Sequence, residues 1–248
     1  MAYSINNYNI ASASGIVAGD TEEQWFTKIS AWLNTLNIGT AEVYNMTETR
    51  NAVRWYPYGN TGVAFLFGHI STNTSSSYDK YWGLGFEYLD NGSPTVCNLS
   101  NSETVRINDC TIHITKTDTD FSIKFTYCVG VGKANQIYTI SYLSYNNSDK
   151  KVAIVRAATN NYTVQVENES SVRTYNRDYN ELPSSNIYTT SRTMLNRFIV
   201  PYTDCAVDNA YWVTGVVPEQ GVIFELDRHK YTVVYNLSNN GCMALKLE

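Results

Sequence analysis

The stretch that decides the fold reads Cys110-Thr-Ile-His-Ile-Thr-Lys-Thr117, then Asp118-Thr-Asp120, then Phe121-Ser-Ile-Lys-Phe-Thr-Tyr-Cys128. Apolar and polar residues alternate in its first part, which places Ile112 and Ile114 on one face of an extended strand. The last part alternates in the same way, and the acidic residues in between are typical of a turn. The pattern predicts an antiparallel hairpin with one buried face.

Further strand patterns lie on both sides of this hairpin. Residues 136–145, 151–156 and 162–167 are separated by Asn-rich turns, which predicts a meander. Shorter strand patterns resume in the last quarter of the chain, at 197–200, 211–214, 222–226, 230–235 and 242–247. The predicted fold class is therefore mainly β: an antiparallel β-sandwich, jelly-roll-like or meander, with one N-terminal amphipathic helix.

The predicted helix runs from about Thr21 to about Asn37. Its first turn is acidic and allows a capping box of Thr21 with Gln24, or of Asp20 with Glu23. Apolar residues recur at steps of three and four, which lines one helix face. We expect this face to pack on the sheet through Trp25, Ile29, Trp32 and Leu36.

The same patterns divide the chain into four segments. Residues 1–45 form an N-terminal segment with the helix at about 21–37, and residues 46–167 form the main β-sandwich. Periodicity fades over 168–193, which predicts a loop-rich connection. Residues 194–248 form C-terminal β-hairpins, either as a separate region or as part of the same sandwich.

Composition excludes several classes of protein. The chain has 248 residues, a formal net charge of −5 and a pI of about 5.3, so it lacks the basic surplus that nucleic-acid binding requires. No apolar run is long enough for a membrane span, and the first residues do not resemble a signal peptide. We therefore expect synthesis in a cytoplasm and five reduced cysteines.

The sequence offers little chemistry. His69, His113 and His229 are isolated from one another, and no nucleophile motif, metal-ligand spacing or phosphate loop is present. We expect no catalytic site, no metal and no cofactor, and therefore no enzyme. A glycoside hydrolase would need two facing carboxylates, for which the candidates are Glu87, Asp118, Asp120, Glu225 and Asp227.

Aromatic residues cluster in one part of the sequence. They could stack on sugar rings or contact a partner, or they could be core and inter-subunit packing residues. The candidate glycan or partner-contact aromatics are Trp55, Tyr56, Tyr58, Tyr81, Trp82 and Tyr88.

Several stretches in the second half of the chain resemble virion proteins of tailed bacteriophages that infect Gram-positive hosts, among tail and baseplate proteins. These stretches are Lys151-Val-Ala-Ile-Val-Arg-Ala-Ala-Thr-Asn-Asn-Tyr-Thr-Val164, Glu167-Asn-Glu-Ser-Ser171, Ile199-Val-Pro-Tyr202, Ala210-Tyr-Trp-Val-Thr-Gly215, Val222-Ile-Phe-Glu-Leu-Asp227 and Lys230-Tyr231.

The resemblance implies a structural component of a phage tail or baseplate, located in the virion and made in the host cytoplasm. Such a protein acts by assembly with other virion proteins, as a homo-oligomer or as repeated copies on a symmetric particle. Two alternatives stay open. One is a receptor- or carbohydrate-binding module that attaches the virion to a host surface glycan, and the other is a glycan or cell-wall hydrolase.

Overall fold

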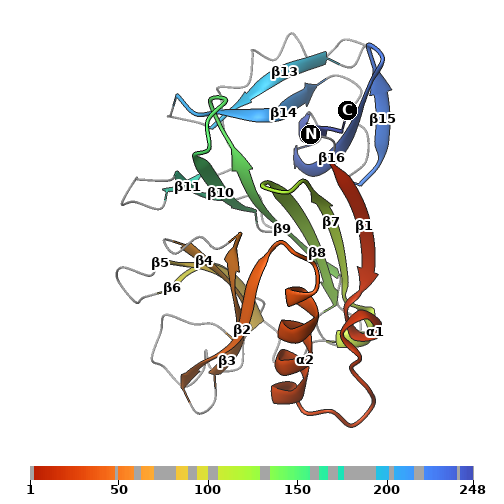
Figure 1. The fold of residues 1–248 in the computed structure, drawn as a ribbon, viewed down its shortest axis with the longest axis vertical. Coiled ribbons are helices and arrows are strands. Elements are labelled where there is room, and N and C mark those ends of the chain that lie inside the picture. The colour runs from red at the N-terminus through yellow and green to blue at the C-terminus, as the bar shows by residue number, and fades with distance from the viewer. Residues whose placement is uncertain are drawn as a thin grey trace. The chain divides into compact units, whose positions relative to one another are not determined.

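The structure is a computed structural model that describes residues 3–47, 50–58, 63–69, 82–88, 94–99, 106–128, 135–156, 162–166, 173–175, 194–200, 204–214, 221–238 and 241–247. Figure 1 shows its elements in chain order. They are β1 (Ser4–Asn9), α1 (Ile10–Ser14), α2 (Glu22–Asn34), β2 (Gly39–Thr47), β3 (Arg50–Pro57), β4 (Val63–His69), β5 (Trp82–Tyr88), β6 (Pro94–Leu99), η1 (Ile107–Asp109), β7 (Thr111–Lys116), β8 (Phe121–Cys128), β9 (Asn135–Ser144), β10 (Lys151–Arg156), β11 (Tyr162–Val166), β12 (Arg173–Tyr175), β13 (Met194–Ile199), β14 (Ala206–Thr214), β15 (Ile223–Leu226), β16 (His229–Ser238) and β17 (Gly241–Lys246).

The described strands form three sheets, so the prediction of a mainly β protein is confirmed. A seven-stranded sheet has the order β1-β7-β8-β9-β10-β11-β12. Two five-stranded sheets have the orders β13-β14-β17-β16-β15 and β2-β3-β4-β5-β6. Helix α1 was not expected from the sequence, and it adds a second short helix before α2.

The chain divides into two compact units that differ from the four predicted segments. Unit 1 contains residues 1–6, 113–124 and 139–248, and unit 2 contains residues 7–112 and 125–138. The boundaries fall within strands β1, β7, β8 and β9 rather than in loops. Most of the predicted connection 168–193 lies outside the described residues, and its described part is β12, which pairs with β11.

The hairpin of β7 and β8 closes at the predicted turn. Thr117 donates its backbone N–H to the carbonyl oxygen of Asp120 over 2.8 Å. Ile112 and Ile114 are buried, as the alternation predicts. Thr115 and Ser122 lie on the opposite, polar face and are buried too, so the expectation of a single buried face is incomplete.

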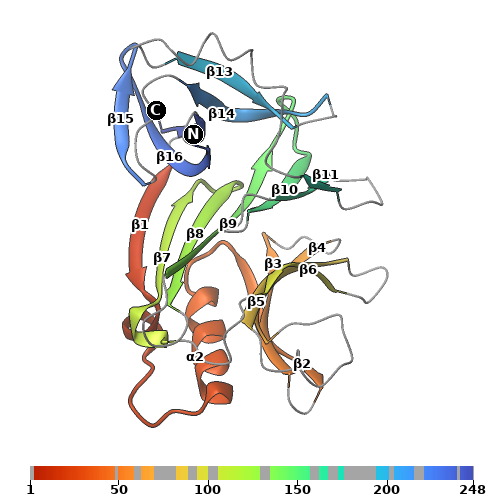
Figure 2. The same ribbon diagram turned by 180° about the vertical axis from the view of Figure 1, so that it is seen from behind.

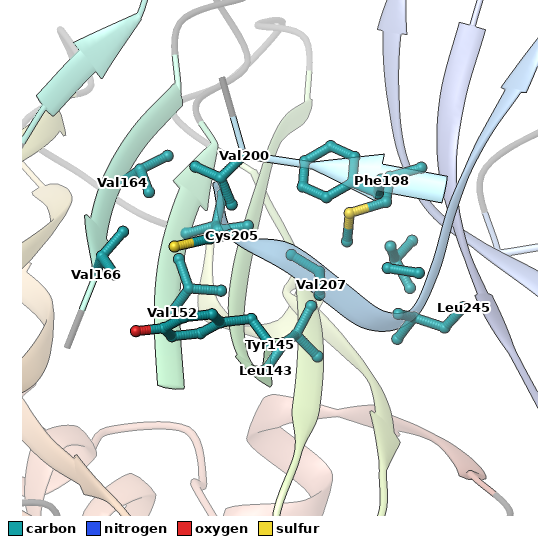
Figure 3. Packing of buried hydrophobic residues seen from close by; sticks show 14 of the residues in the cluster. Leu143, Tyr145, Val152, Val164, Val166, Phe198, Val200, Cys205, Val207 and Leu245 are labelled. Carbon is teal, nitrogen blue, oxygen red and sulfur yellow. The ribbon is translucent and has the colours of Figure 1, made fainter. Parts of the chain in front are cut away.

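The main core of unit 1 joins strands from two sheets (Figure 3). Leu143, Val152 and Val164 come from β9, β10 and β11, and they pack with Phe198 and Val207 of the C-terminal sheet. The residues of this cluster are at most 8 % exposed. Burial of so many aliphatic side chains contributes most of the stability of the unit. The C-terminal hairpins therefore share a core with part of the predicted main domain.

Helix α2 lies beside β2 in unit 2 (Figure 2). Its capping box forms between Thr21 and Gln24, the first of the two predicted pairs. The buried residues of its face are Phe26, Ile29, Ser30, Trp32 and Leu33, whereas Trp25 and Leu36 are half-buried. At the end of the helix the side-chain amide of Asn34 exchanges two hydrogen bonds with the backbone of Ala41, at 2.8 and 2.7 Å.

Three cysteines have described side chains. Cys110, Cys205 and Cys242 are buried and form no disulfide, while the side chains of Cys97 and Cys128 lie outside the described residues. Burial raises the pKa of the Cys242 thiol to about 12. Among the helices that the structure describes, none is long and apolar enough to cross a membrane.

Candidate functional site

The six predicted contact aromatics do not form one described surface. Trp55 is 3 % exposed, and its ring lies 6.1 Å from that of Phe65, so it belongs to the packing of its sheet. Tyr56 and Tyr58 are half-buried. Tyr81 lies outside the described residues, and the backbones of Trp82 and Tyr88 in β5 are described but their side chains are not.

Tyr56 is part of a polar network on the sheet of unit 2. Its hydroxyl donates to Glu42 Oε1 over 2.8 Å and accepts from Arg54 Nη1 over 3.3 Å. The guanidinium of Arg54 also lies 3.4 Å from the centroid of the Tyr44 ring, a cation–π contact. Burial, followed by the hydrogen bond to Glu42, raises the pKa of Tyr56. The network thus holds these four side chains against one another on the sheet.

Each of the three histidines lies in a different strand. His69 is in β4 with a side chain outside the described set, His113 is half-buried in β7, and His229 is exposed at the start of β16. Burial, and then the charge of Lys124, lower the pKa of His113. Among the described residues no group of three His, Cys, Asp or Glu side chains could hold a metal ion.

The candidate carboxylates for a hydrolase have different surroundings. Asp118, Glu225 and Asp227 are exposed, whereas Asp120 is 5 % exposed. Asp120 forms an ion pair of 2.6 Å with Lys151 and accepts hydrogen bonds from the backbone N–H and the hydroxyl of Ser144. Its carboxylate is thus paired with a cation and hydrogen-bonded within the fold. The side chain of Glu87 lies outside the described residues.

Unlike Asp120, Lys124 in β8 has no oppositely charged partner among the described residues. Its side chain is half-buried, and burial lowers its pKa. Within the described part of the chain, no carboxylate lies within ion-pair distance of Lys124. A cation that has lost part of its hydration without gaining a counter-charge is unfavourable in the isolated chain. Such a group is a candidate for binding an anion from outside.

Gly221, which lies next to the Lys124 amino group, comes two residues before an edge strand. A Cβ atom placed on Gly221 would lie 3.8 Å from Lys124 Nζ, an ordinary van der Waals distance, so the ammonium lies beside the side-chain position that Gly221 leaves empty. Gly221 has φ +87°, a left-handed conformation that glycine adopts easily. The two residues that follow it, Val222 and Ile223, are 42 % and 52 % exposed.

Strand β15 begins at Ile223 and is the last strand in its sheet. It returns into β16 through Asp227 and Arg228, both with positive φ, as in the two-residue turns that fit the twist of hairpins. On the far side of β15 the described residues form no further strand. An exposed edge with apolar side chains is a surface at which another chain can add a strand.

The amino-acid pattern alone did not predict this surface. Glu225 was a candidate only as a hydrolase carboxylate, and Lys124 occupies a polar position of an alternating strand. The exposed Val222-Ile223 pair beside a turn was the available signal, but the alternation of a strand does not reveal whether it lies at an edge.

Comparison with other proteins gives no relative. The chain matches no family model, no curated protein and no solved structure.

Proposed function

We propose that this protein is a structural component of a phage virion, of the tail or baseplate type, that works by binding other protein chains. The observation that carries the proposal is the edge of the C-terminal sheet, where Val222 and Ile223 are 42 % and 52 % exposed. Soluble β proteins normally protect such edges with charges, bulges or covering segments. A subunit of an assembly can leave an edge open because a neighbouring chain covers it.

The resemblance of residues 151–164, 167–171, 199–202, 210–215, 222–227 and 230–231 to tail and baseplate proteins supports the same proposal. Those stretches include β10, β14 and β15, which belong to unit 1. Unit 1 thus contains both the stretches that carry the resemblance and the open edge.

Side chains of β9–β11 and of the β13–β17 sheet pack into one cluster within unit 1. We propose that these two sheets form the antiparallel β-sandwich predicted from the sequence, with the cluster as its interior.

The polar network around Tyr56 favours a second candidate function, carbohydrate binding. The network of Tyr56, Glu42 and Arg54 combines hydrogen-bonding groups with the Tyr44 ring, which are the groups that bind sugars. A carbohydrate-binding module on the virion would use such a face to attach to a host surface glycan. Glycan-array binding that is lost in Tyr56→Ala would support it.

Two measurements on native material test the structural role. Mass spectrometry of purified particles should find this chain at a fixed, repeated copy number. In parallel, the purified chain should release no product from host cell wall or glycans. A chain that is absent from particles and hydrolyses a host polymer, with activity abolished by changing one carboxylate, would overturn the proposal.

A further inference from the structure

The hydrogen-bond pattern of β15 determines which of its backbone groups point outward. Val233 donates its N–H to the carbonyl oxygen of Val222 over 3.2 Å and accepts the N–H of Gly221 over 2.8 Å, so Gly221 and Val222 together oppose Val233 at a bulge. In antiparallel strands hydrogen-bonded and non-hydrogen-bonded pairs alternate. Phe224 opposite Tyr231 is then the next bonded pair, and the backbone groups of Ile223 and Glu225 point away from β16.

The side chains at this edge leave two complementary charges without partners. Glu225 is exposed, and in the described part of the chain it forms no ion pair, even with Lys230 opposite it in β16. The ammonium of Lys124, beside Gly221, likewise has no carboxylate among the described residues. Among the described residues of one chain, neither Glu225 nor Lys124 forms an ion pair, although both lie at the same edge.

We propose that two copies of this chain pair β15 with β15 in antiparallel fashion about a twofold axis at Ile223. In this register Ile223 lies opposite its own symmetry mate, and Glu225 of one copy lies beside the bulge at Gly221 of the other. The two Ile223 Cα atoms lie about 5.5 Å apart in such a pair. The vacant side-chain position of Gly221 then admits the Glu225 carboxylate next to Lys124 Nζ.

The exposed apolar residues select the same register. The two Ile223 side chains, each 52 % exposed, pack against one another at the axis, and Val222 of each copy lies opposite Phe224 of the other. A shift of the axis to Phe224 would place Glu225 opposite Ile223 and leave both Lys124 ammonium groups without a carboxylate. Because side-chain direction alternates along a strand, a one-residue shift changes every contact.

The interface is isologous: each copy supplies one Glu225 and one Lys124, and two ion pairs flank an apolar centre. Strand β15 has only 4 residues. Stable interfaces bury about 1,200–2,000 Å², so the edge alone supports a concentration-dependent dimer, strengthened where copies are held together on a particle. The inference deepens the proposed function, because it names the self-contact through which this chain assembles.

A charge exchange tests the pairing in the purified full chain by sedimentation equilibrium. E225K and K124E should each weaken dimerisation about tenfold, and the double variant should recover it, since the charges are exchanged but still opposite. D149K is the matched control, because Asp149 is an exposed carboxylate in a turn away from the edge. Equal effects of E225K and D149K, or no recovery in the double variant, would overturn the inference.

A second variant does not depend on how a chain with K124E folds. I223C places two thiols across the axis at a Cα separation compatible with a disulfide. Mild oxidation should give a covalent dimer of I223C and none of V17C, a control at a residue that is 61 % exposed. Failure of I223C to cross-link overturns the self-pairing, and absence of the chain from purified particles separately overturns the virion role.

Discussion

Two lysines of unit 1, on strands of the same sheet, have opposite surroundings. Lys151 is held by Asp120 at 2.6 Å, by the Ser144 hydroxyl at 2.6 Å and by the Thr119 carbonyl oxygen at 3.0 Å. Lys124 is half-buried beside the β15 edge, with no carboxylate near it in the described part of the chain. Lys151 therefore stabilises the fold, whereas we infer that Lys124 contacts a partner chain.

Burial explains why the difference matters. A buried charge is tolerated when a counter-charge and hydrogen bonds replace water, as they do around Lys151. For Lys124 no described carboxylate provides this replacement, and the proposed dimer supplies it from a second copy. The region around Asp120 should therefore govern stability, and the region around Lys124 should govern association.

The largest effect is expected for Asp120→Ala. This change leaves the Lys151 ammonium buried without its carboxylate, so the free energy of unfolding should fall by about 3–5 kcal/mol. Chemical denaturation measures it. Asp118→Ala, two residues away and exposed, is the control and should change the free energy of unfolding by less than about 0.5 kcal/mol. Equal effects of the two changes would mean that the ion pair contributes nothing.

A smaller effect is expected for Ser144→Ala. The hydroxyl of Ser144 donates to Asp120 over 2.7 Å and accepts from Lys151. Removing hydrogen bonds to charged groups should lower the free energy of unfolding by about 1.5–3 kcal/mol. In the Asp120→Ala background the same change should have less effect because one partner is already gone. Strict additivity of the two changes would contradict a shared network.

Lys124→Met should behave differently from any change at Lys151. It removes a half-buried cation that has no counter-charge among the described residues, so the free energy of unfolding of the dilute monomer should stay within about 1 kcal/mol or rise. The same variant should weaken the concentration-dependent association. A loss of stability comparable to that of Asp120→Ala would show that Lys124 is satisfied within its own chain.

Thiol reactivity compares a closed and an open position without changing stability. At pH 8 the native Cys242 thiol should react very slowly, because burial blocks access and raises its pKa to about 12. The introduced thiol of I223C should react rapidly in dilute solution and slowly when the chain is concentrated. After denaturation without reductant the wild-type chain should titrate five thiols, and fewer would reveal a disulfide.

The raised pKa of the Cys242 thiol also makes the stability of the protein depend on pH. Its native pKa lies above that of the unfolded chain, so its contribution to stability is complete below the unfolded value of 9.0 and is lost as the pH rises toward 12. A high pH should therefore lower the free energy of unfolding through Cys242, which lies in the core and not at the β15 edge.

Local patterns predicted the elements better than their contacts. The alternation from Cys110 to Cys128 was enough to predict the β7–β8 hairpin, and the three-and-four spacing after Thr21 predicted a helix where α2 lies. Both signals are periodicities within one element. By contrast, Asp120 meets Ser144 and Lys151 across 24 and 31 residues, which strand pairing decides and one sequence does not show.

The edge was harder still to predict. Val222 and Ile223 read as ordinary strand residues, because a strand in the centre of a sheet and a strand at its edge have the same alternation. Only the order β13-β14-β17-β16-β15 places β15 last and leaves its outer side open in the described structure. The role proposed for Lys124 depends on the same strand order, because Lys124 lies beside the β15 edge.

Reconstruction of the native particle tests the assembly role most directly. If the protein works by assembly through this edge, every ordered copy should have β15 paired with β15 of a neighbouring copy, with Lys124 within ion-pair distance of the neighbour's Glu225. Particles in which β15 is exposed to solvent in all copies, or from which the chain is missing, would contradict the account.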